Sequence, residues 1–363
     1  MHESENPEIF RLRILDASIN RASEGLRVVE DFTRMGLEDA FLSSQLKNLR
    51  HDLTAAIGPL DAVSRVQSRE SEIDVGRSIS TDAEQQRADI MALIASNMAR
   101  VQQAFRAIEE YCKSHHGQIA QQVEQLRYRA YTLEKAIIST AFNVQRLDQV
   151  QLYVLVDGCD GDVQKLGALV SSLASAGVNF IQLRDKTLSD RELVASGNVV
   201  RDAIANTSCR WVMNDRADLA VATGAHGVHL GQDDITVHAA RKILGSGKII
   251  GVSTHSIEQA HQAVIDGADY IGVGPTFASQ TKSFTEFPGL DLVRAVTDQL
   301  SIPAFAIGGV DLTNVDQVIS CGCVRIAVAS AVSRRDDPAA AATSLLHRLT
   351  QTSKRRQKAD ESG

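Results

Sequence analysis

Hydrophobic residues in the first 147 positions recur with the period of an α-helix. The spacing of three and four residues defines two apolar faces, one formed by Leu15, Ile19, Ala22, Leu26 and Val29, the other by Ile94, Met98, Val101, Phe105, Ile108 and Cys112. Thr81 and Glu84 have the spacing of a capping box, which would open the second helix. The pattern predicts an all-helical segment over residues 1–147.

The two apolar faces lie in stretches that also resemble each other. Residues 21–32 align with residues 100–111, and this alignment matches Arg21 with Arg100, Arg27 with Arg106, Glu30 with Glu109 and Phe32 with Tyr111. A second correspondence joins residues 49–50 to residues 126–127. We infer a duplicated pair of helices, arranged as a four-helix bundle. Salt bridges along the helix faces account for the matched charges.

After residue 148 the pattern changes to short apolar runs that alternate with helical stretches. Eight runs are found, at residues 152–156, 179–183, 211–213, 227–230, 249–252, 270–273, 304–307 and 324–328. Their continuous hydrophobicity is typical of parallel strands that are buried on both faces. Eight such units in about 200 residues predict an α/β fold, a closed (β/α)₈ TIM barrel. A doubly wound open sheet is the structural alternative.

The chain therefore divides into three predicted parts. Residues 1–147 form an all-helical domain, residues 148–350 form the barrel, and residues 351–363 form a polar, disordered tail. The helical domain has no evident chemistry of its own. We expect it to serve as a dimerisation module or as a docking site for a partner of the same pathway.

Composition narrows the classes of function. The formal net charge is −7 and only 4% of residues are aromatic, which argues against binding of nucleic acid or an anionic membrane. The sequence contains no run of about 18 apolar residues that could span a membrane, and its first residues lack the apolar core of a signal peptide. The five cysteines have no metal-site spacing, so we expect reduced thiols in a cytoplasmic protein.

Polar residues follow nearly every predicted strand. In a TIM barrel these positions meet at one rim, where the active site forms. Arg184, Lys186 and Lys282 would face a polyanionic group there, and Asp215 and Asp234 fit beside it only with a divalent cation such as Mg²⁺. The pair of glycines at 308–309 would let backbone N–H groups approach a phosphate. The rim thus predicts a metal-assisted diphosphate site and a separate monophosphate site.

Seven motifs in this order carry a specific resemblance: QLRDK, MNDR, GVHLGQDD, GVSTH, GPTFASQTK, AIGGV and ASAVS. Together they closely resemble the thiamine phosphate synthase family over residues 150–335. The resemblance implies a transferase that joins 4-amino-2-methyl-5-(diphosphooxymethyl)pyrimidine to a thiazole phosphate, carboxylated or not, with release of pyrophosphate. Residues 1–148 also look like an N-terminal extension found on some bacterial members of the family.

The resemblance also implies roles for individual residues. The pyrimidine diphosphate would contact Gln182, Arg184, Lys186, Asn214, Ser253 and Lys282, and one Mg²⁺ per active site would be held by Asp215 and Asp234. The thiazole phosphate would contact Ser279, Thr281, Gly308 and Ser330. Among these, the catalytic residues would be Arg184, Lys186, Ser253 and Lys282. His229 and His255 are expected to pack at strand ends with their rings hydrogen-bonded.

Two positions depart from the family pattern, and two other functions compete with the synthase. Arg325 stands where a small or apolar residue is expected, and Ala329 stands where a larger aliphatic residue is common; both concern the phosphate end of the site. A thiazole-phosphate tautomerase on the same scaffold would not need Arg184, Lys186 or the two aspartates. A non-catalytic sensor of thiamine intermediates would not need an intact polar rim. The residues present therefore favour the synthase.

Overall fold

A computed structural model describes residues 7–70, 87–278 and 288–360 of the chain. It contains two compact units, Met1–Ile138 and Ser139–Gly363. Helix α6 (Gly117–Arg146) runs from one unit into the other. The expected boundary at residue 147 coincides with the end of this helix, whereas packing assigns the last turns of α6 to the second unit.

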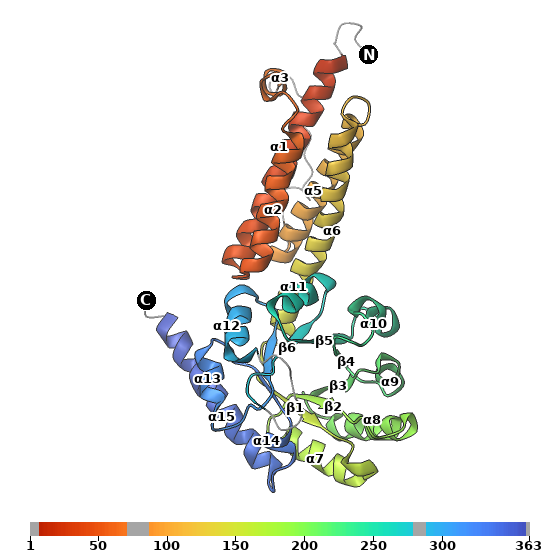
Figure 1. Ribbon diagram of the computed structural model, residues 1–363, viewed down its shortest axis with the longest axis vertical. Coiled ribbons are helices and arrows are strands. Elements are labelled where there is room, and N and C mark those ends of the chain that lie inside the picture. Colours follow the sequence, from red (N-terminus) through yellow and green to blue (C-terminus); the bar gives the residue numbers. More distant parts are fainter. Residues whose placement is uncertain (1–6, 71–86, 279–287, 361–363) are drawn as a thin grey trace. The chain divides into compact units, whose positions relative to one another are not determined.

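The first unit consists of helices, as the hydrophobic pattern predicts. Besides α6, the described residues form α1 (Pro7–Met35), α2 (Ala40–Ile57), α3 (Ala62–Gln67) and α5 (Ile90–Cys112) (Figure 1). Both predicted apolar faces are buried, one on α1 and one on α5. The predicted N-terminus of α5 is wrong. This helix begins at Ile90, where the Asp89 side chain accepts a hydrogen bond from the Ala92 N–H; Thr81 and Glu84 lie outside the described residues.

The sequence repeat in the first unit is also a repeat of contacts. On α1 and α2, Arg50 Nε lies 3.1 Å from Glu30 Oε2, and on α5 and α6, Arg127 Nε lies 3.1 Å from Glu109 Oε2. Both carboxylates are buried, so each pair fixes one helix against the next. Helix α1 packs along α5. A Cβ atom on Gly25 would lie 2.8 Å from Val101 Cγ2, so the absence of a side chain there permits the close approach.

The second unit is a closed parallel barrel, which confirms the predicted fold and excludes the open sheet. Its strands are β1 (Leu152–Val156), β2 (Phe180–Leu183), β3 (Arg210–Asn214), β4 (Gly227–Leu230), β5 (Ile249–Thr254), β6 (Tyr270–Val273), β7 (Ala304–Ile307) and β8 (Ile326–Val328). They pair in chain order, and β1 closes the ring on β8 with Tyr153 opposite Ala327. The carboxyl ends of all eight strands therefore open at one rim.

Helices follow the strands and cover the barrel (Figure 1). They are α7 (Val163–Ser175), α8 (Asp190–Ile204), α9 (Ala217–Ala222), α10 (Val237–Leu244), α11 (Ile257–Asp266), α12 (Gly289–Gln299), α13 (Val315–Ser320), α14 (Ser330–Ser333) and α15 (Pro338–Asp360), with a 3₁₀ turn η2 (Cys159–Gly161). Helix α15 continues past residue 351, where a disordered tail was expected. The segment is rich in Lys, Arg, Gln and Ala, which favour helix once a packed turn precedes them.

The end of the barrel opposite the rim is closed by a cluster of buried side chains. Most come from positions near the starts of the strands, and two come from the segment that joins α6 to β1: Leu147, Val150, Tyr153, Phe180, Val212, Ile249, Tyr270, Phe305 and Ala327. The end of α6 is bound to the same unit, since Asn143 Nδ2 donates to Asp269 Oδ1 at 2.8 Å and Arg210 Nη1 donates to the Arg146 carbonyl at 2.9 Å. Residues 139–150 are therefore part of the barrel's packing.

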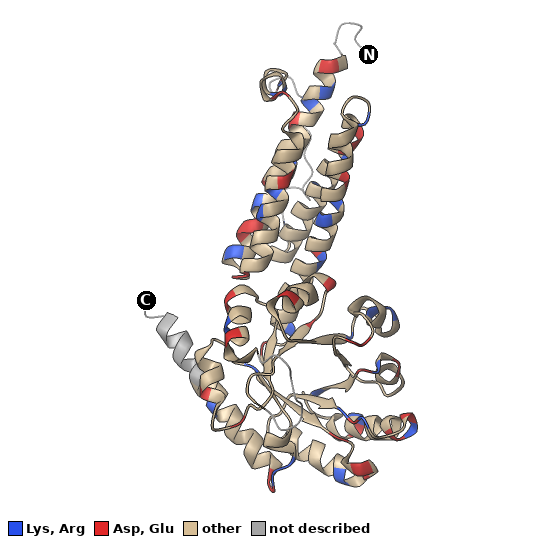
Figure 2. Cartoon of the chain, viewed as in Figure 1, with Lys and Arg blue, Asp and Glu red and all other residues tan. Residues whose placement is uncertain are grey.

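Charged residues are distributed over both units. Figure 2 shows acidic and basic positions interspersed along the helices of each unit rather than gathered into a basic stripe. Among the described residues, no helix combines the length and the apolar character needed to cross a membrane.

Candidate active site

A pocket of about 360 Å³ lies at the carboxyl ends of the strands, where the rim was predicted. All eight strands or their following loops contribute to it. Of the predicted site residues, the structure brings six together in its wall: Gln182, Arg184, Asn214, Ser253, Gly308 and Ser330. Ser279, Thr281 and Lys282 lie outside the described residues.

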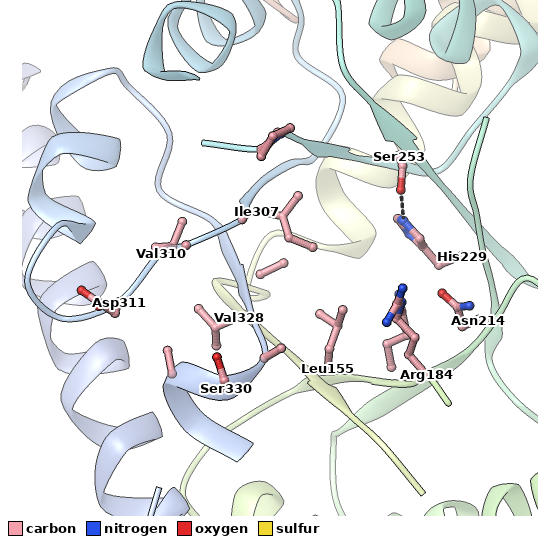
Figure 3. A pocket seen from close by; sticks show the side chains of 18 of the residues that line it. Leu155, Arg184, Asn214, His229, Ser253, Ile307, Val310, Asp311, Val328 and Ser330 are labelled. Atoms are coloured by element: carbon pink, nitrogen blue, oxygen red, sulfur yellow. Dashed lines mark hydrogen bonds between the residues drawn. The ribbon is translucent and has the colours of Figure 1, made fainter. Parts of the chain in front are cut away.

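The pocket has two sides of different chemistry. Figure 3 shows Arg184, Asn214, His229 and Ser253 gathered on one side, and Val310, Asp311 and Ser330 on the other. Apolar side chains of Leu155, Ile307 and Val328 lie between them. A ligand with polar groups at both ends and an apolar middle fits such a wall.

The loop after β2 is fixed by its own sequence. The Arg184 N–H donates to the Val156 carbonyl at 2.8 Å, which extends the strand pairing by one residue. The Asp185 carboxylate accepts hydrogen bonds from the N–H groups of Gly158, Thr187 and Leu188. Although burial opposes it, these bonds and one from the Thr187 hydroxyl lower the pKa of Asp185. Asp185 therefore remains ionised and holds the turn that presents Arg184 and Lys186.

Asp215 stands directly after β3 in an unusual backbone conformation. Its φ angle is 60°, a left-handed value that Asp and Asn tolerate better than most residues. Its N–H donates to the His229 carbonyl at 2.8 Å, so the turn is anchored to β4. The Lys186 Nζ lies 3.7 Å from Asp215 Oδ2. This turn aims the carboxylate toward the loop after β4.

That loop supplies a second carboxylate, Asp234. Its Oδ2 accepts a hydrogen bond of 2.7 Å from the Gly231 N–H, and the side chain is within hydrogen-bonding reach of Asp215. Burial first, and then the adjacent Asp234, raises the pKa of Asp215, while Lys186 and Arg184 act in the opposite direction. Two carboxylates held this close favour a shared cation.

The donor set fits a magnesium ion better than a metal that is enclosed by protein ligands. Among the residues that the structure describes, no group of three or more His, Cys, Asp or Glu side chains converges on one point. Mg²⁺ is typically held by one or two carboxylates together with water and substrate phosphate oxygens. Asp215 and Asp234 have the donor atoms that such a site requires from the protein, and the positive charges of Lys186 and Arg184 lie close to Asp215.

The opposite side of the pocket is formed by backbone that follows β7 and β8. Gly308 and Gly309 both have positive φ angles, 96° and 67°. A Cβ on Gly308 would lie 2.9 Å from Pro275, and a Cβ on Gly309 would lie 2.9 Å from the Phe277 Cβ. Glycine is therefore required at both positions for the two loops to meet and to leave their backbone open to the pocket.

Two charged residues on this side were missed by the sequence analysis. Asp311 and Arg335 both line the pocket beside Gly308 and Ser330. The pKa of Asp311 is lowered, chiefly by a hydrogen bond from the Thr313 hydroxyl, with a smaller effect of the Arg335 charge. Asp311 directly follows the motif AIGGV, and Arg335 lies beyond the motif ASAVS, so neither residue belongs to the segments that carry the resemblance.

His229 is hydrogen-bonded through both ring nitrogens, as expected. Nε2 lies 2.9 Å from Ser253 Oγ (Figure 3), and Nδ1 lies 2.9 Å from the Tyr270 hydroxyl. Burial lowers the pKa of His229 to about 4, so the ring is neutral at pH 7. His255 is bonded as well, with Nδ1 2.5 Å from the Gly274 carbonyl oxygen.

The two departures from the family pattern differ in their consequences. Ala329 lines the pocket beside Ser330. Arg325 precedes the first residue of β8, at the end of the strand away from the rim, and its buried Nε has no hydrogen-bond partner among the described residues. Burial lowers the pKa of Arg325. Arg325 therefore stands at the opposite end of the strand from the phosphate side of the pocket.

Comparisons with known proteins agree with this geometry. The profile of a family described as thiamine monophosphate synthase matches residues 152–332, which include all eight strands. A profile described as the ThiD2 family matches residues 13–136 in the helical unit.

Individual relatives extend the similarity through both units. A thiamine-phosphate synthase from Rhodopirellula baltica is 42% identical over 334 residues, covering 90% of this chain and 89% of the relative. One from Thermosynechococcus vestitus is 37% identical, covering 93% and 95%. A solved thiamine phosphate pyrophosphorylase from Pyrococcus furiosus is 30% identical with a TM-score of 0.50, covering 56% of this chain and 97% of that one. The chain therefore belongs to the thiamine-phosphate synthase family.

Proposed function

We propose that the rim pocket binds both substrates of the reaction, the pyrimidine diphosphate on its β2–β5 side and the thiazole phosphate on its β6–β8 side. The chain is a transferase that condenses 4-amino-2-methyl-5-(diphosphooxymethyl)pyrimidine with a thiazole phosphate to give thiamine phosphate and pyrophosphate. The two polar sides of the pocket, with an apolar wall between them, support this arrangement.

The diphosphate side is assigned to Gln182, Arg184, Lys186, Asn214 and Ser253. Arg184 and Lys186 stand at the turn after β2, where their charges meet a leaving group that becomes more negative as its bond to carbon breaks. Lys282 is assigned to the same group by its place in the motif GPTFASQTK. These three residues are the proposed electrostatic catalysts, and Ser253 is proposed to contact the reacting pyrimidine.

Asp215 and Asp234 are the proposed ligands of one Mg²⁺. When bound, the ion would neutralise charge on the pyrophosphate oxygens as the leaving group departs. The raised pKa of the half-buried Asp215 and its closeness to Asp234 support this assignment, because two neighbouring carboxylates repel each other without a cation.

The thiazole side is assigned to Gly308 and Ser330, with Ser279 and Thr281 assigned from the sequence motif alone. The backbone of this side holds the monophosphate, and the thiazole nitrogen then faces the pyrimidine methylene. No general base is required, since that nitrogen carries a free lone pair. The protein supplies orientation and excludes water from a pocket whose floor is apolar.

The single observation that carries the assignment of the diphosphate side is the carboxylate pair beside Lys186 and Arg184. Purified protein should form thiamine phosphate from the two substrates only when Mg²⁺ is present, because two carboxylates facing a diphosphate repel it otherwise. The measurement is product formation with Mg²⁺ and with chelator, with Mg²⁺ restored in a third sample as the control. Product formed at the same rate in chelator would contradict the metal assignment. The same samples should be tested for thiazole phosphate isomerisation, the activity of the competing tautomerase.

The helical unit is proposed to join two copies of the chain or to bind a partner of the pathway. Its described surface exposes large apolar side chains, among them Phe10, Tyr111, Tyr128 and Tyr131, and Phe10 contacts Tyr111 edge to face. Exposed aromatic residues are common at interfaces.

Removal of the helical unit should lower the assembled mass in solution while thiamine phosphate formation continues, because the described pocket residues all lie between 155 and 335. The shortened chain should begin at residue 139, so that the barrel keeps Asn143, Leu147 and Val150. Light scattering on both chains is the measurement. The proposal would be contradicted if both chains had the same number of copies per assembly and the full chain bound no partner.

The proposal extends to the compartment. All five cysteines are free and buried, which suits a reducing environment such as the cytoplasm.

A further inference from the structure

A continuous chain of hydrogen bonds runs through the barrel interior and both of its ends line the pocket. Gln182 Nε2 donates to the Tyr153 hydroxyl, which lies 2.9 Å from the Tyr270 hydroxyl. Tyr270 contacts His229 Nδ1 at 2.9 Å, and His229 Nε2 contacts Ser253 Oγ at 2.9 Å. These five residues are called the relay. They come from β1, β2, β4, β5 and β6, so the relay crosses the barrel.

The interior of the relay is closed to water. Tyr153 is 1% exposed, Tyr270 is 0% exposed and His229 is 5% exposed. The three rings also pack on one another, with Tyr153 and Tyr270 in an edge-to-face contact. Gln182 and Ser253 line the pocket, and so does the edge of His229, although both of its ring nitrogens are bonded within the relay. Every hydrogen in the relay must therefore find its acceptor within the relay or in the pocket.

With the Gln182 amide nitrogen facing Tyr153, counting hydrogens gives the direction of the other bonds. Because the Gln182 amide donates to Tyr153, the Tyr153 hydrogen goes to Tyr270, and the Tyr270 hydrogen goes to His229 Nδ1. A neutral imidazole carries one hydrogen, so that of His229 resides on Nε2 and is donated to Ser253 Oγ. The hydrogen of Ser253 is then available to a ligand, and so is the carbonyl oxygen of Gln182.

The opposite direction requires the Gln182 amide to turn over. If Ser253 donated to His229, then His229 Nδ1 would donate to Tyr270 and Tyr270 to Tyr153. The Tyr153 hydrogen would then need the Gln182 oxygen as its acceptor, since an unpaired hydroxyl in the core is costly. The amide nitrogen of Gln182 would face the pocket instead. The orientation of Gln182 and the role of Ser253 are therefore coupled through three buried side chains.

We propose that the relay sets the hydrogen-bonding polarity of the pocket, so that Gln182 accepts, Ser253 donates, and the site selects an aminopyrimidine over its oxo analogue. This inference rests on the proposed function, which places the pyrimidine beside these two residues. The edge of a 4-aminopyrimidine offers an N–H donor next to a ring-nitrogen acceptor, and the 4-oxo analogue offers the reverse pair. Tyr153, Tyr270 and His229 are thus positioning residues, which act on the ligand through Gln182 and Ser253.

The first test reverses the relay from one end and detects the change at the other. In Gln182→Glu, an ionised carboxylate can only accept, so Tyr153 donates to it and every later bond turns around. The hydrogen on His229 should move from Nε2 to Nδ1, which ¹⁵N chemical shifts of labelled histidine report directly at a pH where the new carboxylate is ionised. This chemical-shift measurement does not require catalysis, so it tests the relay even if the proposed reaction does not occur.

The matched control is the double variant Gln182→Glu with Tyr153→Phe. Without the Tyr153 hydroxyl, the acceptor that remains for Tyr270 within the relay is His229 Nδ1, so the hydrogen should return to Nε2 as in the unmodified chain. The same ring position in Gln182→Glu and in the unmodified chain would overturn the proposal. So would a shift to Nδ1 in the double variant, because the effect would then bypass the relay.

A second test uses Tyr153→Phe alone, in case Gln182→Glu does not fold. The phenyl ring keeps the packing against Phe180 and Phe305, so only the link to Gln182 is lost. The preference for the amino over the oxo pyrimidine diphosphate, measured as a ratio of kcat/KM, should fall roughly tenfold. This is the contribution of one hydrogen bond that no longer distinguishes the two substrates. A purely structural role would lower both kcat/KM values equally, and an unchanged ratio would overturn the proposal.

Discussion

Asp215→Asn should lower kcat about 100- to 1000-fold and remove most of the response to Mg²⁺, since it deletes one of two proposed ligands from a site that works by charge neutralisation. Asn is the informative replacement, because it tolerates the left-handed backbone at φ 60° and preserves the shape of the side chain. An alanine there would combine a loss of charge with backbone strain. The measurement is kcat as a function of Mg²⁺ concentration.

The fold should not suffer from this change. The pKa of Asp215 is raised in the folded chain, so its charged form opposes folding, and stability is gained as the pH falls and the group takes up a proton. Without Mg²⁺, Asp215→Asn should therefore be as stable as the unmodified chain at neutral pH, or more so, and it should lose that pH dependence. Thermal unfolding at several pH values separates the loss of rate from a loss of structure.

Asp233→Asn is the matched control, because Asp233 is an exposed carboxylate next to Asp234 in the same loop. It should keep both the rate and the Mg²⁺ response. If Asp215→Asn behaved like this control, with rate and metal response intact, Asp215 would not be a metal ligand and the diphosphate side of the pocket would need a different account.

Gly251→Ala should destabilise the barrel by ~4 kcal/mol or prevent folding, through steric conflict inside a closed core. Gly251 on β5 lies opposite Tyr270 on β6, and a Cβ there would fall 2.0 Å from Tyr270 Cζ and 2.4 Å from its hydroxyl oxygen. Tyr270 is fully buried and bonded to Tyr153 and His229, so it cannot move aside without breaking those bonds. Denaturant unfolding followed by circular dichroism gives the change in free energy.

Gly247→Ala is the control for this prediction. Gly247 lies just before β5, and a Cβ at this position would meet nothing within 4 Å. Its free energy of unfolding should stay within about 0.5 kcal/mol of the unmodified chain, as is usual for an open surface position. Equal stabilities of the two variants would mean that β5 and β6 can separate at this point.

Much of the site follows from the sequence because parallel strands deliver their carboxyl ends to one rim. Gln182, Arg184, Asn214 and Ser253 are found together in one pocket wall for that reason alone. The relay could not be predicted in the same way. Tyr153 and Tyr270 lie near the starts of their strands, and a hydrophobic pattern reports that such residues are buried without reporting which polar atoms they meet. Their pairing depends on the stagger of strands that are far apart in sequence.

Helix ends were the least predictable part of the fold, for a related reason. Thr81, Glu84 and Asp89 all belong to residue types that can cap a helix, and local spacing alone does not choose among them. The first buried position of α5 is Ile94, so the packed face begins close to Asp89 rather than to Thr81. The extension of α15 to Asp360 likewise depends on the packed turns that come before it.

The repeated hairpin in the helical unit has a consequence for how such a unit can change over time. Two copies of a hairpin in one chain have separate sequences. A substitution can therefore change the contacts of one copy and leave those of the other as they were. The Glu30–Arg50 and Glu109–Arg127 pairs are features that both copies share. Asp16, buried and bound by Arg69 at 2.6 Å, has Ala95 as its counterpart under the same alignment. The symmetry of the repeat is thus present at the carboxylate–guanidinium pairs and absent at Asp16, so a substitution at Asp16 changes one copy alone.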